Sequence, residues 1–215
     1  MLAEALGSAG LITAVVGSGI MATRLTDDVG VQLLINAIAT AAALVVLIVV
    51  WGPVSGAHLN PVVTAALAAQ KLVPAREILP TVLAQIAGFA AGAVLANLMF
   101  GGAAVTISST VRAEPGLWLG EVVATAGLVA VILTLVARGQ QSWIPTAVGL
   151  YIASAYFVTS STSFANPGIT LGRMLSDTFA GIAPESVPGF IVAQSVGAAL
   201  GLLAVRFVLA PSART

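Results

Sequence analysis

The feature that most constrains this chain is a five-residue motif that occurs twice, 106 positions apart. The two copies are Asn60-Pro61-Val62-Val63-Thr64 and Asn166-Pro167-Gly168-Ile169-Thr170. Asparagine is a preferred N-cap and proline is favoured at the first helical position, so each Asn-Pro pair predicts the start of a helix. Two such starts, placed alike in the two halves of an apolar chain, suggest two broken helices that meet inside a bilayer.

Composition places these motifs in a membrane. Of the 215 residues, 59% are hydrophobic and 7% are charged, and the mean hydropathy is +1.07. Soluble globular domains do not have this composition. Six apolar stretches stand out, and most of them approach the roughly 20 residues that span a bilayer as helix: Ala9–Ile20, Val31–Val50, Thr81–Phe100, Leu117–Val136, Ile144–Val158 and Phe190–Ala210. We expect an all-α membrane protein with six spanning helices, the first of which is not a cleaved signal because Glu4 stands where positive charge belongs.

Three landmarks recur in the same order in the two halves. They are Glu4 with Gly10-Leu11 and Glu121 with Gly127-Leu128, the two Asn-Pro motifs, and Ala84-Gln85 with Gly88 and Gly92 against Ala193-Gln194 with Gly197 and Gly201. An odd number of spans separates Glu4 from Glu121, so the second copy enters from the opposite face, as in an inverted repeat. We expect one membrane domain over residues 1–215, with repeat 1 at about 1–110 and repeat 2 at about 115–210. The glycine pairs have the spacing of close helix contacts, and we favour packing as their role.

The segments that begin with Asn-Pro are too short to cross a bilayer. As helix, Asn60 to Lys71 covers about 18 Å, roughly half a bilayer. Two half-helices that dip from opposite faces would meet near the midplane with the positive ends of their dipoles facing. The non-helical lead-ins, Ser55–Leu59 and Thr162–Ala165, are permitted at that depth only if they line a watery cavity or are buried in protein. The sequence therefore predicts a pore.

The run Ser55-Gly56-Ala57-His58-Leu59-Asn60-Pro61 resembles the first pore loop of the aquaporins and aquaglyceroporins, the major intrinsic proteins, and the resemblance extends over all six spans. It implies six tilted helices plus two half-helices, one pore in each monomer, and a homotetramer in the lipid bilayer. It also implies that the pore centre is formed by Asn60, Pro61, Asn166 and Pro167, and that the pore loops are supported by Glu4, Glu121 and His58. For the two glutamates, a place at the membrane interface is the alternative; for His58, structural hydrogen bonding is favoured over a gating or pH role.

The second motif departs from the family pattern at its most selective position. The family usually has arginine three residues after the second asparagine, and this chain has Ile169. Counting back without gaps gives Thr40, Ser154 and Ser163 as the other constriction residues. For the second of these, Tyr156, two residues further on, is the alternative to Ser154. The side chains of this ring are small and mostly neutral, so we expect a constriction wider than a strict water filter. The segment 164–182 is most similar to a bacterial subgroup linked to arsenic resistance, whose substrates are uncharged metalloid acids.

Arg173 lies four residues beyond Ile169 and therefore on the same helix face, one turn of about 5.4 Å farther out. We expect it to supply at the pore mouth the positive charge that the constriction lacks, with Asp177 holding the guanidinium to one side. The alternative is a solvated surface ion pair between Arg173 and Asp177.

These features predict a passive channel for water and small uncharged solutes such as glycerol or metalloid acids, and no enzyme. With no cysteine and a single histidine we expect no metal or cofactor, and a net charge of zero gives no reason to expect a nucleic-acid partner. A mainly water-selective channel is the alternative; a secondary transporter, which also uses inverted repeats, is less favoured, and an ion channel is disfavoured by the facing helix N-termini.

Charge distribution gives the expected orientation. With both termini cytoplasmic, five basic residues lie inside (Lys71, Arg76, Arg138, Arg206, Arg214) and three lie outside (Arg24, Arg112, Arg173), the latter with Asp27, Asp28, Glu114, Asp177 and Glu185. Because cytoplasmic loops carry an excess of Lys and Arg, this bias supports that orientation, in a bacterial inner membrane.

Overall fold

The computed structural model describes residues 1–208, and its regular elements there are all helices. They are α1 (Leu2–Leu25), α2 (Val29–Ser55), α3 (Pro61–Ala69), α4 (Ala75–Met99), α5 (Pro115–Ala137), α6 (Ile144–Val158), α7 (Pro167–Arg173) and α8 (Val187–Val208), with short 3₁₀ helices η1 (Gln141–Trp143) and η2 (Pro184–Ser186) before α6 and α8.

Five of the six predicted spans are long and apolar enough to cross a membrane: α1, α2, α4, α5, and η2 with α8. The sixth, α6, has the predicted bounds but only 15 residues, which cover about 22 Å at 1.5 Å per residue. The other helices extend beyond the predicted stretches, since α1 begins at Leu2 and α2 continues through Pro53 to Ser55. The predicted last span ends at Ala210, outside the described residues.

The helices pair in the same way in both repeats, because α1 packs mainly on α4 and α5 mainly on α8. The four glycines of the repeated landmark lie at these crossings, and a Cβ on any of them would overlap a backbone carbonyl of the partner helix. Gly88 and Gly92 face the carbonyls of Ala5 and Ala9, and Gly197 and Gly201 face those of Val122 and Ala126. The packing role predicted for these glycines is confirmed.

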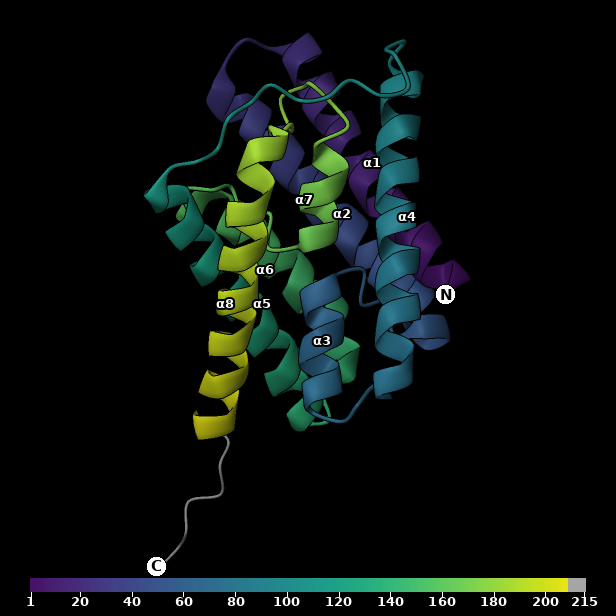
Figure 1. Ribbon diagram of the computed structural model, residues 1–215, viewed down its shortest axis with the longest axis vertical. Helices are drawn as coiled ribbons and strands as arrows, with labels where there is room; N and C mark the ends of the chain where they lie inside the picture. Colours follow the sequence, from purple (N-terminus) through teal and green to yellow (C-terminus); the bar gives the residue numbers. More distant parts are fainter. Residues whose placement is uncertain (209–215) are drawn as a thin grey trace, which may run out of the picture.

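The half-helices α3 and α7 lie one above the other in the centre of the molecule (Figure 1). Each contacts both α4 and α8, so both are wedged between the two helix pairs. They have nine and seven residues, and α3 is shorter than the stretch from Asn60 to Lys71 that the sequence suggested. The chain leaves α3 through Lys71 in the left-handed region, with φ 60°, which ends the helix early.

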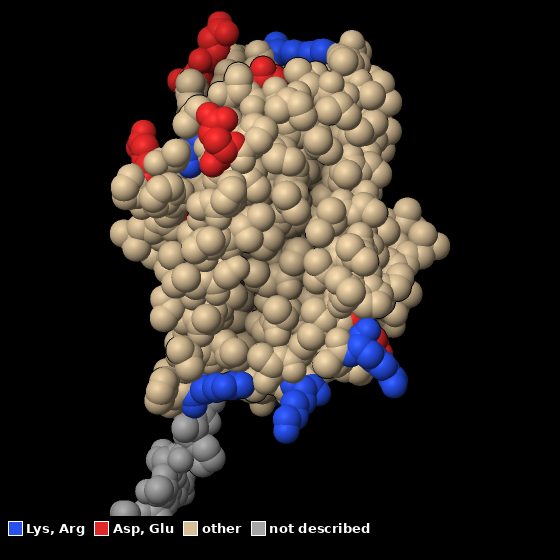
Figure 2. Space-filling model, in the orientation of Figure 1, with Lys and Arg blue, Asp and Glu red and all other residues tan. Residues whose placement is uncertain are grey.

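The molecule has two polar ends, here called the α3 end and the α7 end. Figure 2 shows Asp and Glu gathered at the α7 end and Lys and Arg mostly at the α3 end, with a wide uncharged surface between them. The linker between the repeats, residues 100–114, crosses the α7 end (Figure 1). It is tied to the segment after α7, because Thr106 N and Ser108 N donate to the carbonyls of Leu175 and Met174, at 3.1 and 2.9 Å.

Candidate pore and its lining

The two Asn-Pro motifs hold each other at the centre of the molecule. Asn60 Nδ2 donates to the carbonyl of Ala165 at 2.8 Å, and Asn166 Nδ2 donates to that of Leu59 at 2.7 Å. The Oδ1 of each asparagine accepts from an amide of its own helix, as a helix cap does. Since a carboxamide has two N–H groups, each asparagine keeps one donor, and both line the central cavity.

Glu4 supports the first pore loop from within the protein. Its Oε1 accepts from Ser55 Oγ at 2.8 Å and His58 N at 2.9 Å, and its Oε2 accepts from Leu59 N at 2.9 Å and Gln85 Nε2 at 2.7 Å. Glu4 is 1% exposed. A buried carboxylate that accepts from four donors supports the loop, as the resemblance implied. The alternative, a place at the membrane interface, is wrong for Glu4.

Glu121 supports the second pore loop in a similar way, through two loop amides and a glutamine. Phe164 N and Ala165 N each donate to one of its oxygens at 2.8 Å, and Gln194 Nε2 donates at 2.6 Å. Glu121 is also fully buried. The sequence showed Gln85 and Gln194 as matching landmarks but gave them no role; a polar residue within an apolar span is the signal that could have identified one.

Both lead-ins have a strained backbone. Non-glycine residues adopt left-handed conformations at matching positions: Ala57 and Leu59 have φ 44° and 47°, and Ser163 and Ala165 have φ 53° and 48°. Such a conformation costs roughly 1–3 kcal/mol per residue and persists only where the surroundings determine it. The two buried carboxylates provide that constraint, because they fix the amides of adjoining residues.

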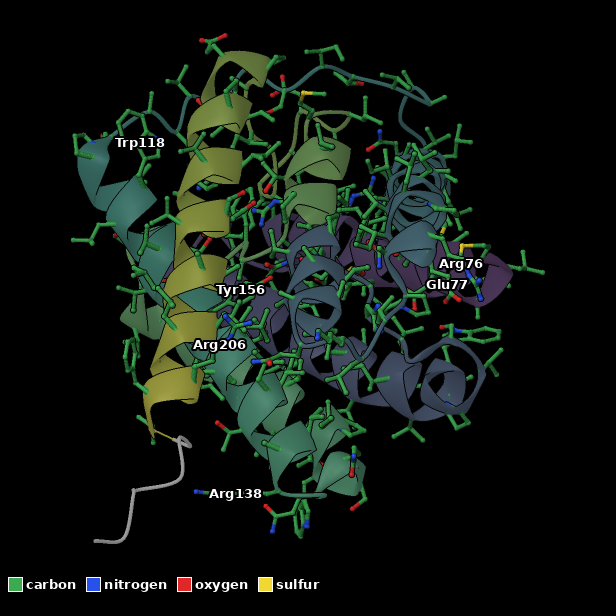
Figure 3. The ribbon with its side chains drawn as sticks, turned by 60° about the horizontal axis from the view of Figure 1, so that its bottom comes forward. Arg76, Glu77, Trp118, Arg138, Tyr156 and Arg206 are labelled. Atoms are coloured by element: carbon green, nitrogen blue, oxygen red, sulfur yellow. The ribbon has the colours of Figure 1, made fainter. Side chains whose placement is uncertain are left out.

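One cavity of about 650 Å³ runs from the α3 end past the asparagine pair as far as Ile169 and Arg173. Leu72, Gln141 and Ser142 line it toward the α3 end, and Ile169 and Arg173 line it beyond the asparagines. In the view from the α3 end, Figure 3 shows Tyr156 in the interior of the bundle. Pro61 and Pro167 begin α3 and α7 at the centre.

Three of the four predicted constriction residues line this cavity: Thr40, Ser163 and Ile169. The prediction is wrong for Ser154, which is exposed on α6. Tyr156 takes its place, 3% exposed, with its hydroxyl donating to Thr40 Oγ1 at 3.1 Å. Side chains two residues apart on a helix point about 200° apart. An alignment that is wrong by two residues therefore picks a residue on the opposite face of the helix.

Arg173 lies in the cavity wall and not at an exposed mouth. It is 3% exposed, its Nε donates to the carbonyl of Ala180, and its guanidinium carbon lies 3.4 Å from the ring centroid of Phe164. Asp177 instead accepts from Ser109 N at 2.9 Å. The predicted contact between Arg173 and Asp177, in either form, is wrong, because Arg173 is held by a carbonyl of the loop after α7 and Asp177 by an amide of the linker between the repeats.

His58 is held by the first pore helix. Its Nδ1 lies 3.1 Å from Thr64 Oγ1, and that hydroxyl lies 3.2 Å from the carbonyl of Asn60, to which it donates. Nδ1 is then the N–H that donates to the Thr64 oxygen, and Nε2 is left as an acceptor. These contacts support the structural role that the sequence favoured. Within residues 1–208 no cluster of His, Asp and Glu could hold a metal ion.

Comparison with known proteins decides the family. The family model for the major intrinsic proteins matches residues 1–163. The chain belongs to this family. It is 47% identical to aquaglyceroporin AqpS of Rhizobium meliloti, over 98% of this chain and 90% of the relative, and 32% identical to aquaporin Z of Bradyrhizobium diazoefficiens, over 96% and 91%. Among solved structures, the aquaglyceroporin from Plasmodium falciparum is 22% identical and superposes with a TM-score of 0.77, covering 97% of this chain and 95% of that chain. That likeness shows the aquaporin fold.

The match to the model of the major intrinsic proteins ends at residue 163, before the second motif. Within that motif, the structure gives a physical reason for the glycine at position 168. A Cβ on Gly168 would overlap the ring of Phe89, a buried residue of α4. Glycine leaves room for this ring, and the sequence alone gave no sign of the contact.

Proposed function

We propose that this chain is a passive channel for water and small uncharged solutes such as glycerol or metalloid acids. The observation that carries the proposal is the cavity, which passes between Asn60 and Asn166 and reaches a ring that has Ile169 where the family usually has arginine. A ring without that guanidinium is wider and leaves room for solutes larger than water.

The geometry suggests how a polar solute passes. At the centre it meets one free N–H from each asparagine and, on either side, the lead-in residues of the two pore loops. The amino ends of α3 and α7 face each other there, so both dipoles orient water with its oxygens toward the midplane. Because the water molecules on the two sides of the midplane point in opposite directions, their hydrogen bonds do not form a continuous relay for protons. The positive potential of the two helix ends also repels cations.

Orientation and location belong to the same proposal. Lys71, Arg76, Arg138 and Arg206 lie in segments near the α3 end, and Figures 2 and 3 show basic side chains there. We place that end in the cytoplasm of a bacterial cell, with both termini inside. A homotetramer rests on the family resemblance; the exposed apolar side chains of α2, such as Ile38, Val46 and Val54, offer a surface for it.

A mainly water-selective channel is the second candidate, and one observation favours it. Arg173 lines the cavity one turn beyond Ile169, and the hydroxyls of Tyr156 and Thr40 are joined there, so a cation with donors still faces the path. A secondary transporter has less support, because it needs ion-coupling groups near the midplane. Glu4 and Glu121 are fully engaged by the loops that they hold.

The test compares water and solute flux in proteoliposomes by stopped-flow light scattering. We expect fast, non-saturating entry of glycerol, and arsenite uptake that follows its gradient alone. Replacing both Asn60 and Asn166 with alanine should reduce both fluxes at least tenfold. The control is Asn36→Ala, which removes a buried amide that donates to the carbonyl of Val15 and does not line the cavity.

Each outcome has a distinct meaning. Glycerol entry no faster than in empty vesicles, with fast water flux, would establish the water-selective candidate. Saturation, or dependence on an ion gradient, would establish a transporter. Equal fluxes in the double variant and in wild type would remove the asparagines from the pore.

A further inference from the structure

Two arginines from distant parts of the chain lie against one aromatic ring at the α7 end. The guanidinium carbon of Arg173, the last residue of α7, lies 3.4 Å from the centroid of Phe164. That of Arg112, in the linker between the repeats, lies 5.4 Å from the same centroid. Their Nε atoms donate to adjoining carbonyls, those of Ala180 and Gly181. Both cations are thus fixed in place by neutral groups.

The negative charge nearest this ring is insufficient to neutralise the two arginines. Glu121 accepts from the amide of Phe164, but both of its oxygens are engaged by loop amides and Gln194. Asp177 is turned toward Ser109, and Glu114 and Glu185 are exposed, where water screens them. Two guanidiniums and one occupied carboxylate leave a local charge of one positive unit.

Arg173 has donors to spare, and they face the cavity. A guanidinium carries five N–H groups, and the hydrogen bond to Ala180 uses one. The residue is 3% exposed and lines the cavity together with Phe164, Tyr156 and Ile169. No nitrogen of Arg173 is among the buried polar atoms of residues 1–208 that lack a partner, so its remaining N–H groups open onto the cavity.

We propose that the α7 end of the cavity is a binding site for a small monoanion that carries a compact apolar group, in the class of short carboxylates and sulfonates. Two of its oxygens accept from the planar fork of Arg173, the geometry in which arginine binds such groups. Its apolar group lies against Ile169, and Arg112, whose guanidinium carbon lies 5.4 Å from the centroid of Phe164, adds positive potential. A bound anion occupies the path beside Tyr156 and therefore blocks the passage of water and neutral solutes.

Binding is measured directly, so the result does not depend on which solute the channel conducts. The probe is methanesulfonate, which stays ionised at every working pH, and the neutral molecule of nearly the same shape is dimethyl sulfone. We expect methanesulfonate to raise the unfolding temperature of the purified protein in detergent and dimethyl sulfone not to. The midpoint of the titration gives Kd.

Arg173→Gln removes the charged fork and should raise Kd about 10- to 100-fold, the change that corresponds to the loss of one charge-assisted hydrogen bond. The matched control is Arg24→Gln. Arg24 also donates to a carbonyl, that of Phe100 at 2.6 Å, and lies over the Phe100 ring at 4.9 Å, but it does not line this cavity. Its replacement should leave Kd unchanged.

Flux provides the second readout. With methanesulfonate on both sides of the vesicle membrane at ten times Kd, simple occupancy leaves about one channel in eleven free, and water flux should fall accordingly. Gluconate at the same ionic strength should have no such effect. If Arg173→Gln does not fold, Arg112→Gln should still weaken binding, by a smaller factor because Arg112 lies farther from the ring and does not line the cavity.

The proposal is overturned if methanesulfonate neither stabilises the protein nor slows water, if dimethyl sulfone acts equally, or if the folded Arg173→Gln or Arg112→Gln variant binds as tightly as wild type. Binding without any measurable flux would leave the anion site standing and would contradict the channel function instead.

Discussion

Replacing Gly168 with alanine would add one methyl group at the most crowded point of the second half-helix. The new Cβ would overlap two ring carbons of Phe89 and would lie 3.3 Å from Oδ1 of Asn166, the atom that caps α7. The ring cannot withdraw easily, because Phe89 is fully buried in the hydrophobic core. Overpacking of a close-packed core costs about 1–3 kcal/mol, and this site belongs at the upper end.

We therefore expect Gly168→Ala to lower the free energy of unfolding by about 2–3 kcal/mol, a factor of roughly 30 to 150 in the equilibrium constant. Phe89→Leu alone should cost about 1–2 kcal/mol by leaving a cavity. In the double variant the methyl group fills space that the ring has vacated. The two costs should then fail to add, with a coupling free energy of about 1–3 kcal/mol.

The assay is reversible unfolding in mixed detergent micelles, with water flux measured on the same variants. Gly116→Ala is the control, because it adds the same methyl group to a helix where nothing lies within 4 Å of the new Cβ; it should be neutral or slightly stabilising. The reasoning is refuted if Gly168→Ala is as stable as wild type, or if its cost and that of Phe89→Leu simply add.

Three further predictions concern the pore and its surroundings. Ile169→Arg should lower glycerol flux at least tenfold and water flux much less, because one guanidinium both narrows the ring and fills it with donors; stopped-flow measurements of both fluxes test this. Glu121→Gln should cost about 2–5 kcal/mol and abolish water flux, since an NH₂ group would face buried amides that lose their acceptor; unfolding in mixed micelles measures the cost, and wild-type stability would contradict it. Hydrogen bonds from the backbone N–H and then the hydroxyl of Ser109 hold the pKa of Asp177 below its ordinary value, so this carboxylate contributes stability above the unfolded pKa of about 3.9 and loses it as the pH falls through the lower folded value. Unfolding midpoints between pH 6 and pH 2.5 should show this acid-side loss in wild type and a flatter profile in Asp177→Asn.

What depends on local rules could be predicted from the sequence. A helix that starts at Asn-Pro needs only its own first turn, and α3 and α7 begin at Pro61 and Pro167 as expected. The support of the loops by Glu4 and Glu121 was also accessible, because a carboxylate in an apolar span needs donors and the two occurred in a repeat.

What depends on contacts between distant residues could not be predicted. Pairing Arg173 with Asp177 followed from helix spacing alone, and the structure replaces it with Phe164 and a carbonyl of the returning loop. Gly168 and Phe89 are 79 positions apart, so nothing in either segment indicates their overlap. The error at Ser154 has a simpler cause: a gap-free count does not fix the rotation of a helix.

The reciprocal bonds of the two asparagines bear on how such a chain can arise. Each repeat supplies the acceptor that the other repeat's asparagine needs, so neither half completes a pore by itself. Two copies of a half-length chain, inserted into the membrane in opposite directions, would make the same pair of bonds. Once the two copies are fused into one gene, the sequence of each repeat can change independently of the other. The differences between His58 and Phe164, and between Leu67 and Arg173 at corresponding positions, are changes of that kind, and they give the two ends of one symmetric passage different chemistry.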